Sequence, residues 1–130
     1  MLNVLVCGGR DYNNARFIHE QLSRIHAERP FSLIIHGAAR GADEWAEHWA
    51  EMNGVQPVAC KALWDKFGRR AGPMRNRAML LLKPHLVVAF HGGAGTEGMV
   101  ALARQAGISV IELADHAERA DGRKSMTPPR

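Results

Sequence analysis

Short apolar runs alternate with longer amphipathic stretches along almost the whole chain. Each run is about five or six residues long, and three of the runs lead into glycine-rich turns. Consecutive apolar residues of this kind are typical of strands that are buried on both faces of a parallel sheet. We therefore predict five strands, at Leu2–Cys7, Ser32–His36, Val55–Cys60, Leu86–Phe90 and Ile108–Leu113.

The stretches between the runs have the spacing of amphipathic helices. The first carries Phe17, Ile18, Leu22 and Ile25 on one face, and Pro30 marks its end. Strand and helix thus alternate throughout, which predicts an α/β fold. The remaining helices are predicted at Ala42–Met52, from Arg70 to about Leu82, and at Thr96–Gln105.

This alternation predicts one Rossmann-like domain over residues 1–115. Its doubly wound parallel sheet is expected to have about five strands in the order 3-2-1-4-5. In this order, ligands bind beyond the carboxyl ends of the first and fourth strands, where the winding direction reverses. Residues 116–130 are mostly polar and end in Pro128-Pro129-Arg130, so we expect a flexible C-terminal tail.

The composition agrees with one globular domain. Of 130 residues, 46% are apolar and 23% are charged, which excludes a disordered chain. No apolar run reaches the roughly 18 residues of a membrane span, and the first residues do not resemble a signal peptide. Cys7 and Cys60 lie within apolar runs, so we expect two buried free thiols in a cytoplasmic protein. We expect no metal site, no required cofactor and no membrane partner.

The net charge of +4 is concentrated in one segment. Residues 61–83 contain seven lysines and arginines but one acidic residue, Asp65. Such a segment favours an anionic partner, either a phosphate-bearing small molecule or a nucleic acid backbone. Trp64 and Phe67 lie in the same segment and are candidates to stack on the bases of a single-stranded nucleic acid.

Glycines gather where predicted strands end. The clusters GGRDY (8–12) and GGAGT (92–96) follow the first and fourth strands, at the expected ligand-binding edge, and a third cluster spans residues 37–43. Glycine lets backbone N–H groups approach a phosphate, and the helix N-terminus behind each loop adds partial positive charge. Tight turns without a ligand also use glycine, so that alternative stays open.

A fourth segment, Gly72 to Arg77, opens a predicted helix with Gly72-Pro73. This places Arg75 and Asn76 in the first turn, where a cation is unfavourable unless an anion is near. Arg75 is therefore our first candidate to contact a phosphate, with a solvated surface arginine as the alternative. Asp43 is a candidate either for a ribose hydroxyl or for a helix cap.

Large apolar side chains also predict self-association. Trp45 and Trp49 lie four residues apart on one predicted helix. Together with Met52, Met79 and Leu80–Leu82 they exceed what one small sheet needs, so we expect a homodimer or a higher homo-oligomer.

Four segments together resemble the SLOG superfamily, and in particular its small bacterial and phage group related to YspA and YpsA. They are GGRDY (8–12), HGAARGAD (36–43), AGPMRNRAM (71–79) and GGAGT (92–96). The resemblance implies a Rossmann-like fold and a nucleotide-derived ligand. The nucleotide-binding residues it implies are Gly8, Gly9, Arg10, Gly37, Arg40, Gly41, Asp43, Arg75, Asn76, Gly92, Gly93, Gly95 and Thr96.

Within this superfamily, the LOG phosphoribohydrolases have a catalytic glutamate two or three positions after the threonine of GGxGT. This chain has Gly98 and Met99 there, which leaves Glu97 and Asp11 as candidate general bases. We therefore expect the protein to bind or sense AMP, ADP-ribose or an NAD-like ligand. The alternatives are N-glycosidic hydrolysis of a nucleoside monophosphate and binding of single-stranded nucleic acid.

Overall fold

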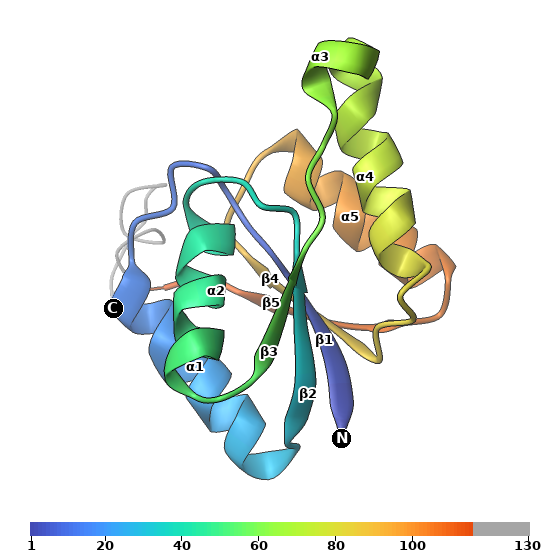
Figure 1. The fold of residues 1–130 in the computed structure, drawn as a ribbon. Helices are drawn as coiled ribbons and strands as arrows, with labels where there is room; N and C mark the ends of the chain where they lie inside the picture. Colours follow the sequence, from blue (N-terminus) through green and yellow to red (C-terminus); the bar gives the residue numbers. More distant parts are fainter. Residues whose placement is uncertain (116–130) are drawn as a thin grey trace.

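The computed structural model describes residues 1–115 and contains a five-stranded parallel sheet flanked by helices (Figure 1). The strand order is β3-β2-β1-β4-β5, which confirms the predicted Rossmann-like α/β fold. The predicted tail, residues 116–130, lies outside the described residues. The strands are β1 (Leu2–Cys7), β2 (Phe31–His36), β3 (Gln56–Ala59), β4 (Leu86–Phe90) and β5 (Ser109–Leu113).

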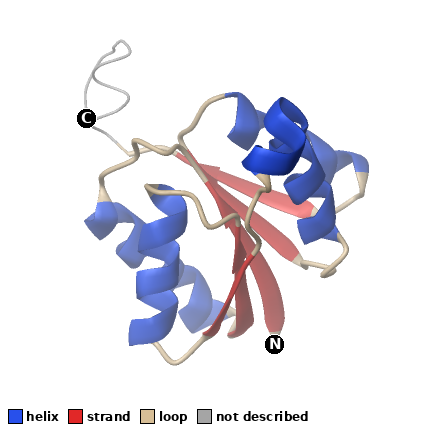
Figure 2. Cartoon of the chain, turned by 45° about the horizontal axis from the view of Figure 1, so that its top comes forward, coloured by secondary structure: helices blue, strands red, loops and turns tan. Residues whose placement is uncertain are grey.

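Helices cover both faces of the sheet, with α1 and α2 on one face and α4 and α5 on the other (Figures 1 and 2). The short α3 continues through a 3-10 turn into α4. The helices are α1 (Ala15–Glu28), α2 (Ala42–Met52), α3 (Trp64–Phe67), η1 (Gly68–Arg70), α4 (Ala71–Leu80) and α5 (Ala94–Gln105).

Strand β1 lies at the centre of the sheet and contributes to both cores. Val4 and Val6 pack with the residues of α1 and α2, whereas Leu5 and Cys7 pack with those of α4 and α5. Side chains alternate between the two faces of a strand, so a strand covered on both sides is apolar at consecutive positions. This is the physical reason for the unbroken apolar run in the sequence.

The segment before β4 contains one helix that was predicted and a short one that was not. The helix predicted from Arg70 to about Leu82 is α4, Ala71–Leu80, but α3 and the turn η1 precede it without having been predicted. Gly68 has a φ of +57° and ends α3, and Lys83 has a φ of +56° just beyond the end of α4. A four-residue helix is too short to produce a recognisable apolar period, so the sequence pattern did not indicate α3.

Other boundaries differ from their predictions by one or two residues. Helix α5 begins at Ala94 instead of Thr96, so the last three residues of the GGAGT cluster (92–96) form its first turn. Strand β3 spans Gln56–Ala59 and is two residues shorter than predicted, because it lies at the edge of the sheet and pairs with β2 alone. Within residues 1–115, no helix is both long and apolar enough to cross a membrane.

Candidate functional site

A cavity of about 710 Å³ opens beyond the carboxyl end of β1, between the glycine loops and helices α4 and α5. The predicted site residues that line it come from four separate segments of the chain. They are Gly8, Gly9, Arg10, Gly37, Asp43, Arg75, Asn76, Gly93, Gly95 and Thr96. The predicted residues Arg40, Gly41 and Gly92 and the candidate bases Asp11 and Glu97 are not part of the lining.

The glycine-rich loop after β1 packs directly against the loop after β2 and is also hydrogen-bonded to the loop after β4. The Gly9 carbonyl accepts a hydrogen bond from the Ala42 N–H at 3.2 Å, and the Gly9 N–H donates to the His91 carbonyl at 2.9 Å. Gly41 has a φ of +81°, and a Cβ at this position would collide with the Gly9 carbonyl. Gly41 is therefore required for loop packing, independently of any ligand.

Gly92 has a similar packing role. A Cβ at Gly92 would collide with the Thr96 hydroxyl and would lie 2.7 Å from the Gly9 nitrogen. The absence of a side chain at this position allows the loop after β4 to touch the loop after β1. For Gly41 and Gly92 the structure thus supports the alternative in which glycine serves a tight turn.

Gly93, Gly95 and Gly98 have no such packing reason. Apart from the adjacent residues and the backbone of the helix itself, no atom of the described residues lies within 4 Å of a Cβ built at any of them, and none has a positive φ. All three line the cavity, and Gly95 and Gly98 belong to α5, where glycine costs about 1 kcal/mol relative to alanine. The open space beside them is the cavity itself.

The first turn of α5 also lacks a side-chain cap. Its N-cap residue is Gly93, which has no side chain to accept a hydrogen bond. The first N–H groups of a helix have no partner within the helix and carry partial positive charge. Because Ala94, Gly95 and Thr96 line the cavity, this end of α5 faces the space that a ligand would occupy. Thr96, which was predicted to begin this helix, is its third residue.

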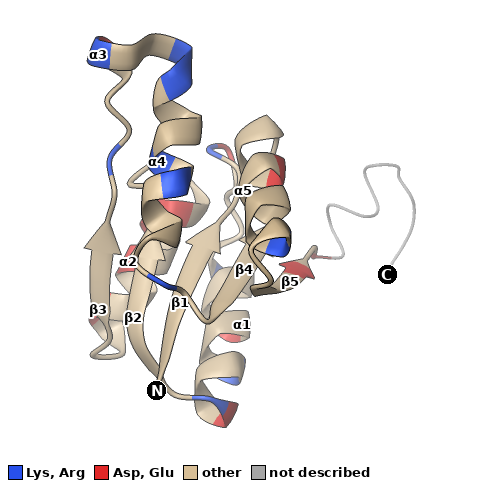
Figure 3. Ribbon diagram, turned by 90° about the vertical axis from the view of Figure 1, so that its right-hand side faces the viewer, with Lys and Arg blue, Asp and Glu red and all other residues tan. Residues whose placement is uncertain are grey.

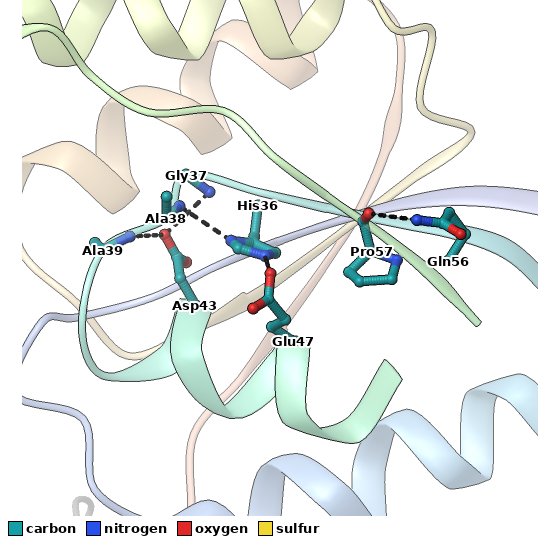
Figure 4. A network of polar contacts seen from close by, with 8 residues as sticks. All are labelled: His36, Gly37, Ala38, Ala39, Asp43, Glu47, Gln56 and Pro57. Atoms are coloured by element: carbon teal, nitrogen blue, oxygen red, sulfur yellow. Dashed lines mark hydrogen bonds and ion pairs between the residues drawn. The ribbon is translucent and has the colours of Figure 1, made fainter. Parts of the chain in front are cut away.

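The loop after β2 uses its backbone N–H groups internally. The Asp43 carboxylate accepts hydrogen bonds from the Gly37 N–H at 3.1 Å and from the Ala39 N–H at 3.2 Å (Figure 4). Asp43 is the second residue of α2 and not its N-cap, so the predicted capping role is wrong. Burial raises the pKa of this carboxyl, while the hydrogen bond from the Ala39 N–H and the charge of Arg75 act in the opposite direction.

His36 completes the same network. Its Nδ1 accepts a hydrogen bond from the Ala38 N–H at 3.0 Å, which leaves the ring proton on Nε2 to donate to Glu47 Oε1 at 2.8 Å (Figure 4). Asp43 and His36 therefore engage three consecutive backbone N–H groups. These groups are directed to the protein's own side chains, so the first turn of α5 is better suited to receive a phosphate.

Arg75 lies in the second turn of α4, one turn further along than predicted. Its Nη1 donates to the Gly37 carbonyl at 2.6 Å, and its Nε donates to Asn76 Oδ1 at 3.0 Å. Burial lowers the pKa of Arg75, while the negative charge of Asp43 opposes this effect. Arg75 therefore joins α4 to the loop after β2 and also lines the cavity. The alternative prediction, a solvated surface arginine, is wrong.

The apolar wall of the cavity was not predicted from the sequence. Helix α5 presents residues at helical spacing toward the cavity, and α3 and α4 add others. The lining residues not predicted as part of a site include Gly72, Pro73, Arg77, Met79, Gly98, Met99, Leu102 and Gln105, whereas Trp64, predicted as a candidate to stack on nucleic-acid bases, also lines the cavity. The spacing of Gly95, Gly98, Met99 and Leu102 along one helical face was the signal that could have found part of this wall.

Carboxylates are scarce around the cavity. Asp11 is exposed and pairs with Arg40 at 3.1 Å, and Glu97 is also exposed. Among the lining residues, Asp43 is the one carboxylate, and its Oδ2 is engaged by the loop. Within residues 1–115, no group of three or more His, Cys, Asp or Glu side chains is placed to hold a metal ion.

Both cysteines are free thiols, as predicted. Cys7 lines the cavity and is buried, and its burial raises the pKa of the thiol to about 12. Cys60 is half-buried, so the expectation of a buried thiol is wrong at this position. Burial also raises the pKa of the Cys60 thiol, and the charge of Arg75 acts against it.

The basic residues of segment 61–83 extend outward from the cavity. Figure 3 shows Lys and Arg gathered on α3 and along the adjoining part of α4. Two of these arginines, Arg75 and Arg77, line the cavity together with Arg10 from the loop after β1. Positive charge is therefore present on both sides of the cavity entrance.

Comparison with known proteins identifies the family to which this chain belongs. Residues 2–67 match the model of the YspA, cpYpsA-related SLOG family. This chain belongs to that family. Another similar protein is the Gene 61 protein of Mycobacterium phage D29, which is 33% identical over 123 residues, covering 88% of this chain and 98% of the phage protein. The resemblance to the SLOG superfamily is thus confirmed.

The part matched by the SLOG family model includes β1, β2 and β3 with their loops. It contains the two interlocked glycine loops and Trp64 at the rim of the cavity. The GGAGT cluster (92–96) and helices α4 and α5 lie beyond the residues that the family model matches.

Proposed function

We propose that this protein binds or senses a nucleotide or a nucleotide-derived ligand, such as AMP, ADP-ribose or an NAD-like molecule, in the cavity beside α5. The observation that carries the proposal is the uncapped first turn of α5, where Gly93 and Gly95 face open cavity space. A phosphate placed against these backbone N–H groups would account for glycines that packing does not require.

Charge around the cavity supports an anionic ligand. Arg10 and Arg77 line the cavity and are exposed. Within the part of the chain that the structure describes, neither pairs with a carboxylate. Two uncompensated guanidinium groups near an uncapped helix N-terminus provide charge-assisted donors for phosphate oxygens. Membership of the SLOG family also supports a nucleotide-related ligand.

The distribution of carboxylates favours binding over hydrolysis. Glycoside hydrolysis needs a carboxylate, or another base, within reach of the reacting bond. Asp11 and Glu97 lie outside the cavity lining, and Asp43 is engaged by two backbone N–H groups. We therefore propose a binding or sensing role and place the hydrolase second.

The test combines thermal shift and calorimetry with AMP, ADP-ribose and NAD. A ligand at 100 times its dissociation constant should raise the free energy of unfolding by about 2.7 kcal/mol. Gly95→Ala should weaken binding at least tenfold, because its methyl group would occupy the phosphate position, while the free protein should be at least as stable as wild type, since alanine is the better helix former.

Glu97→Ala is the matched control, because Glu97 lies on the same helix but outside the cavity lining. This variant should bind like wild type and should leave any slow turnover of AMP unchanged. The proposal is wrong if none of the three ligands raises the melting temperature, or if Gly95→Ala binds as tightly as wild type.

A further inference from the structure

Trp64 lies at the rim of the cavity, at the start of α3, and is 45% exposed. Its ring rests on the first turn of α4. A Cβ at Gly72 would lie 3.1 Å from Cη2 of the indole, closer than an ordinary contact. The small residue at position 72 therefore allows the indole to pack closely on α4, while much of the ring remains accessible.

Arg10 covers part of this accessible ring. Its guanidinium carbon lies 5.1 Å from the centroid of the Trp64 ring, in a cation–π contact. Arg10 comes from the loop after β1, so this contact spans the cavity entrance from one wall to the other. Exposed cation–π contacts are weak, and within residues 1–115 no carboxylate holds Arg10 in place.

The cavity is larger and less polar than a phosphate requires. Its volume is about 710 Å³, and Met79, Met99 and Leu102 form an apolar part of its wall. A ligand with its phosphate at the first turn of α5 therefore has an organic part that must fill apolar space. Trp64 is the aromatic side chain that lines this space, and every nucleobase has a flat face that stacks on an aromatic ring.

We propose that Trp64 is the stacking surface for the nucleobase of the ligand. This inference rests on the proposed function and deepens it, because it assigns the ligand to nucleotides and excludes base-free sugar phosphates. The base takes the place of the Arg10 guanidinium on the indole face, and Arg10 then turns toward the phosphate. Trp64 thereby determines which phosphate-bearing molecules bind tightly.

The experiment compares AMP with ribose 5-phosphate, which has the same sugar and phosphate but no base. Calorimetry on wild type should give at least tenfold tighter binding of AMP. Trp64→Ala should lose about tenfold or more of the affinity for AMP and leave the affinity for ribose 5-phosphate unchanged. Trp64→Phe should keep most of the preference, because a phenyl ring also stacks.

Trp45→Phe is the matched control. Trp45 is 36% exposed, close to the exposure of Trp64, but it lies on α2 and does not line the cavity. This variant should keep both affinities. A Trp64→Ala protein that is merely destabilised would lose affinity for both ligands together, which a melting curve would also reveal and which would overturn the stacking assignment.

The outcomes separate this inference from the proposed function. Equal affinities of wild type for AMP and ribose 5-phosphate would overturn the stacking role and leave a phosphate-binding cavity intact. A preference for AMP that survives in Trp64→Ala would also overturn it. Failure of both ligands to bind wild type would overturn the proposed function, and the stacking role with it.

Discussion

Arg75 makes two hydrogen bonds within the protein while it also lines the cavity. One of them reaches the carbonyl of Gly37, which is buried and would lose this donor if the side chain were removed. A buried acceptor left without a partner costs more than the hydrogen bond itself contributes. Binding and stability are therefore linked at this residue.

Arg75→Ala should lower the free energy of unfolding by roughly 1–3 kcal/mol, because the Gly37 carbonyl loses its donor. It should also weaken AMP binding, and Arg75→Lys should recover part of both losses, since a single ammonium cannot form both bonds of the guanidinium. Chemical denaturation and calorimetry on both variants measure the two effects.

Arg77→Ala provides the comparison on the same helix. Arg77 is exposed and lines the cavity, and within residues 1–115 it makes no ion pair. Its removal should weaken binding while stability changes by less than about 0.5 kcal/mol. Equal stability losses in the two variants would show that the hydrogen bond to Gly37 contributes nothing specific.

At the scale of elements, α1 and α2 pack together on one face of the sheet through polar as well as apolar contacts. Trp49 Nε1 donates to Ser23 Oγ at 2.9 Å, and the rings of His19 and His48 lie 5.3 Å apart. Burial lowers the pKa of His19, and the nearby His48 lowers it further. Protonation of this pair therefore opposes the packing of the two helices.

Because the pKa of His19 is lowered in the folded state, the unfolded chain binds more protons as the pH falls through the ordinary histidine range. Stability should therefore be highest above about pH 7 and should decrease as the pH falls toward 5. His48→Gln removes the neighbouring charge and should make this decrease smaller. Denaturation at several pH values measures it, and an identical pH profile in the variant would contradict the prediction.

The sequence predicted best those elements that have an unbroken apolar run or a long amphipathic period. The run Leu2–Cys7 and the helix Ala42–Met52 have the predicted boundaries. The α3–η1 segment was missed because its structure depends on the positive φ of Gly68 and on the packing of Trp64 against Gly72, and neither leaves a periodic pattern. Tertiary contacts, and not local preference, shape this part of the chain.

At the scale of the whole molecule, the large apolar side chains are divided between core and surface. Trp49 and Met79, which were expected to support self-association, are buried in the protein's own core. Two exposed sets remain, and they lie on elements that cover opposite faces of the sheet. They are Trp45 and Met52 on α2, and Leu81 and Leu82 after α4.

Self-association thus remains a prediction with fewer residues to support it. Wild type should sediment as a dimer or a larger oligomer at micromolar concentration, because burial of either exposed set would remove apolar surface from water. Paired substitutions to glutamate, in Trp45 with Met52 and separately in Leu81 with Leu82, should identify the interface when one pair gives a monomer. A monomeric wild type would contradict the prediction.

The sequence predicted where in the fold the candidate site lies, but it did not predict what each residue of the site does. Strand order and glycine clusters indicated the end of the sheet at which the cavity lies, and ten of the thirteen predicted nucleotide-binding residues line that cavity. Sequence could not show that Gly41 and Gly92 fit the loops together, or that Asp43 binds the backbone of its own loop. Those roles depend on distances between segments far apart in the chain.

The state of the two thiols has a practical consequence for labelling chemistry. Thiolate is the species that reacts with a maleimide, and burial raises the pKa of both Cys7 and Cys60. An exposed cysteine introduced by Asn53→Cys, in the turn between α2 and β3, would therefore react first. That turn lies at the end of the sheet opposite the cavity, so a dye or a surface anchor attached there would leave the cavity facing solution.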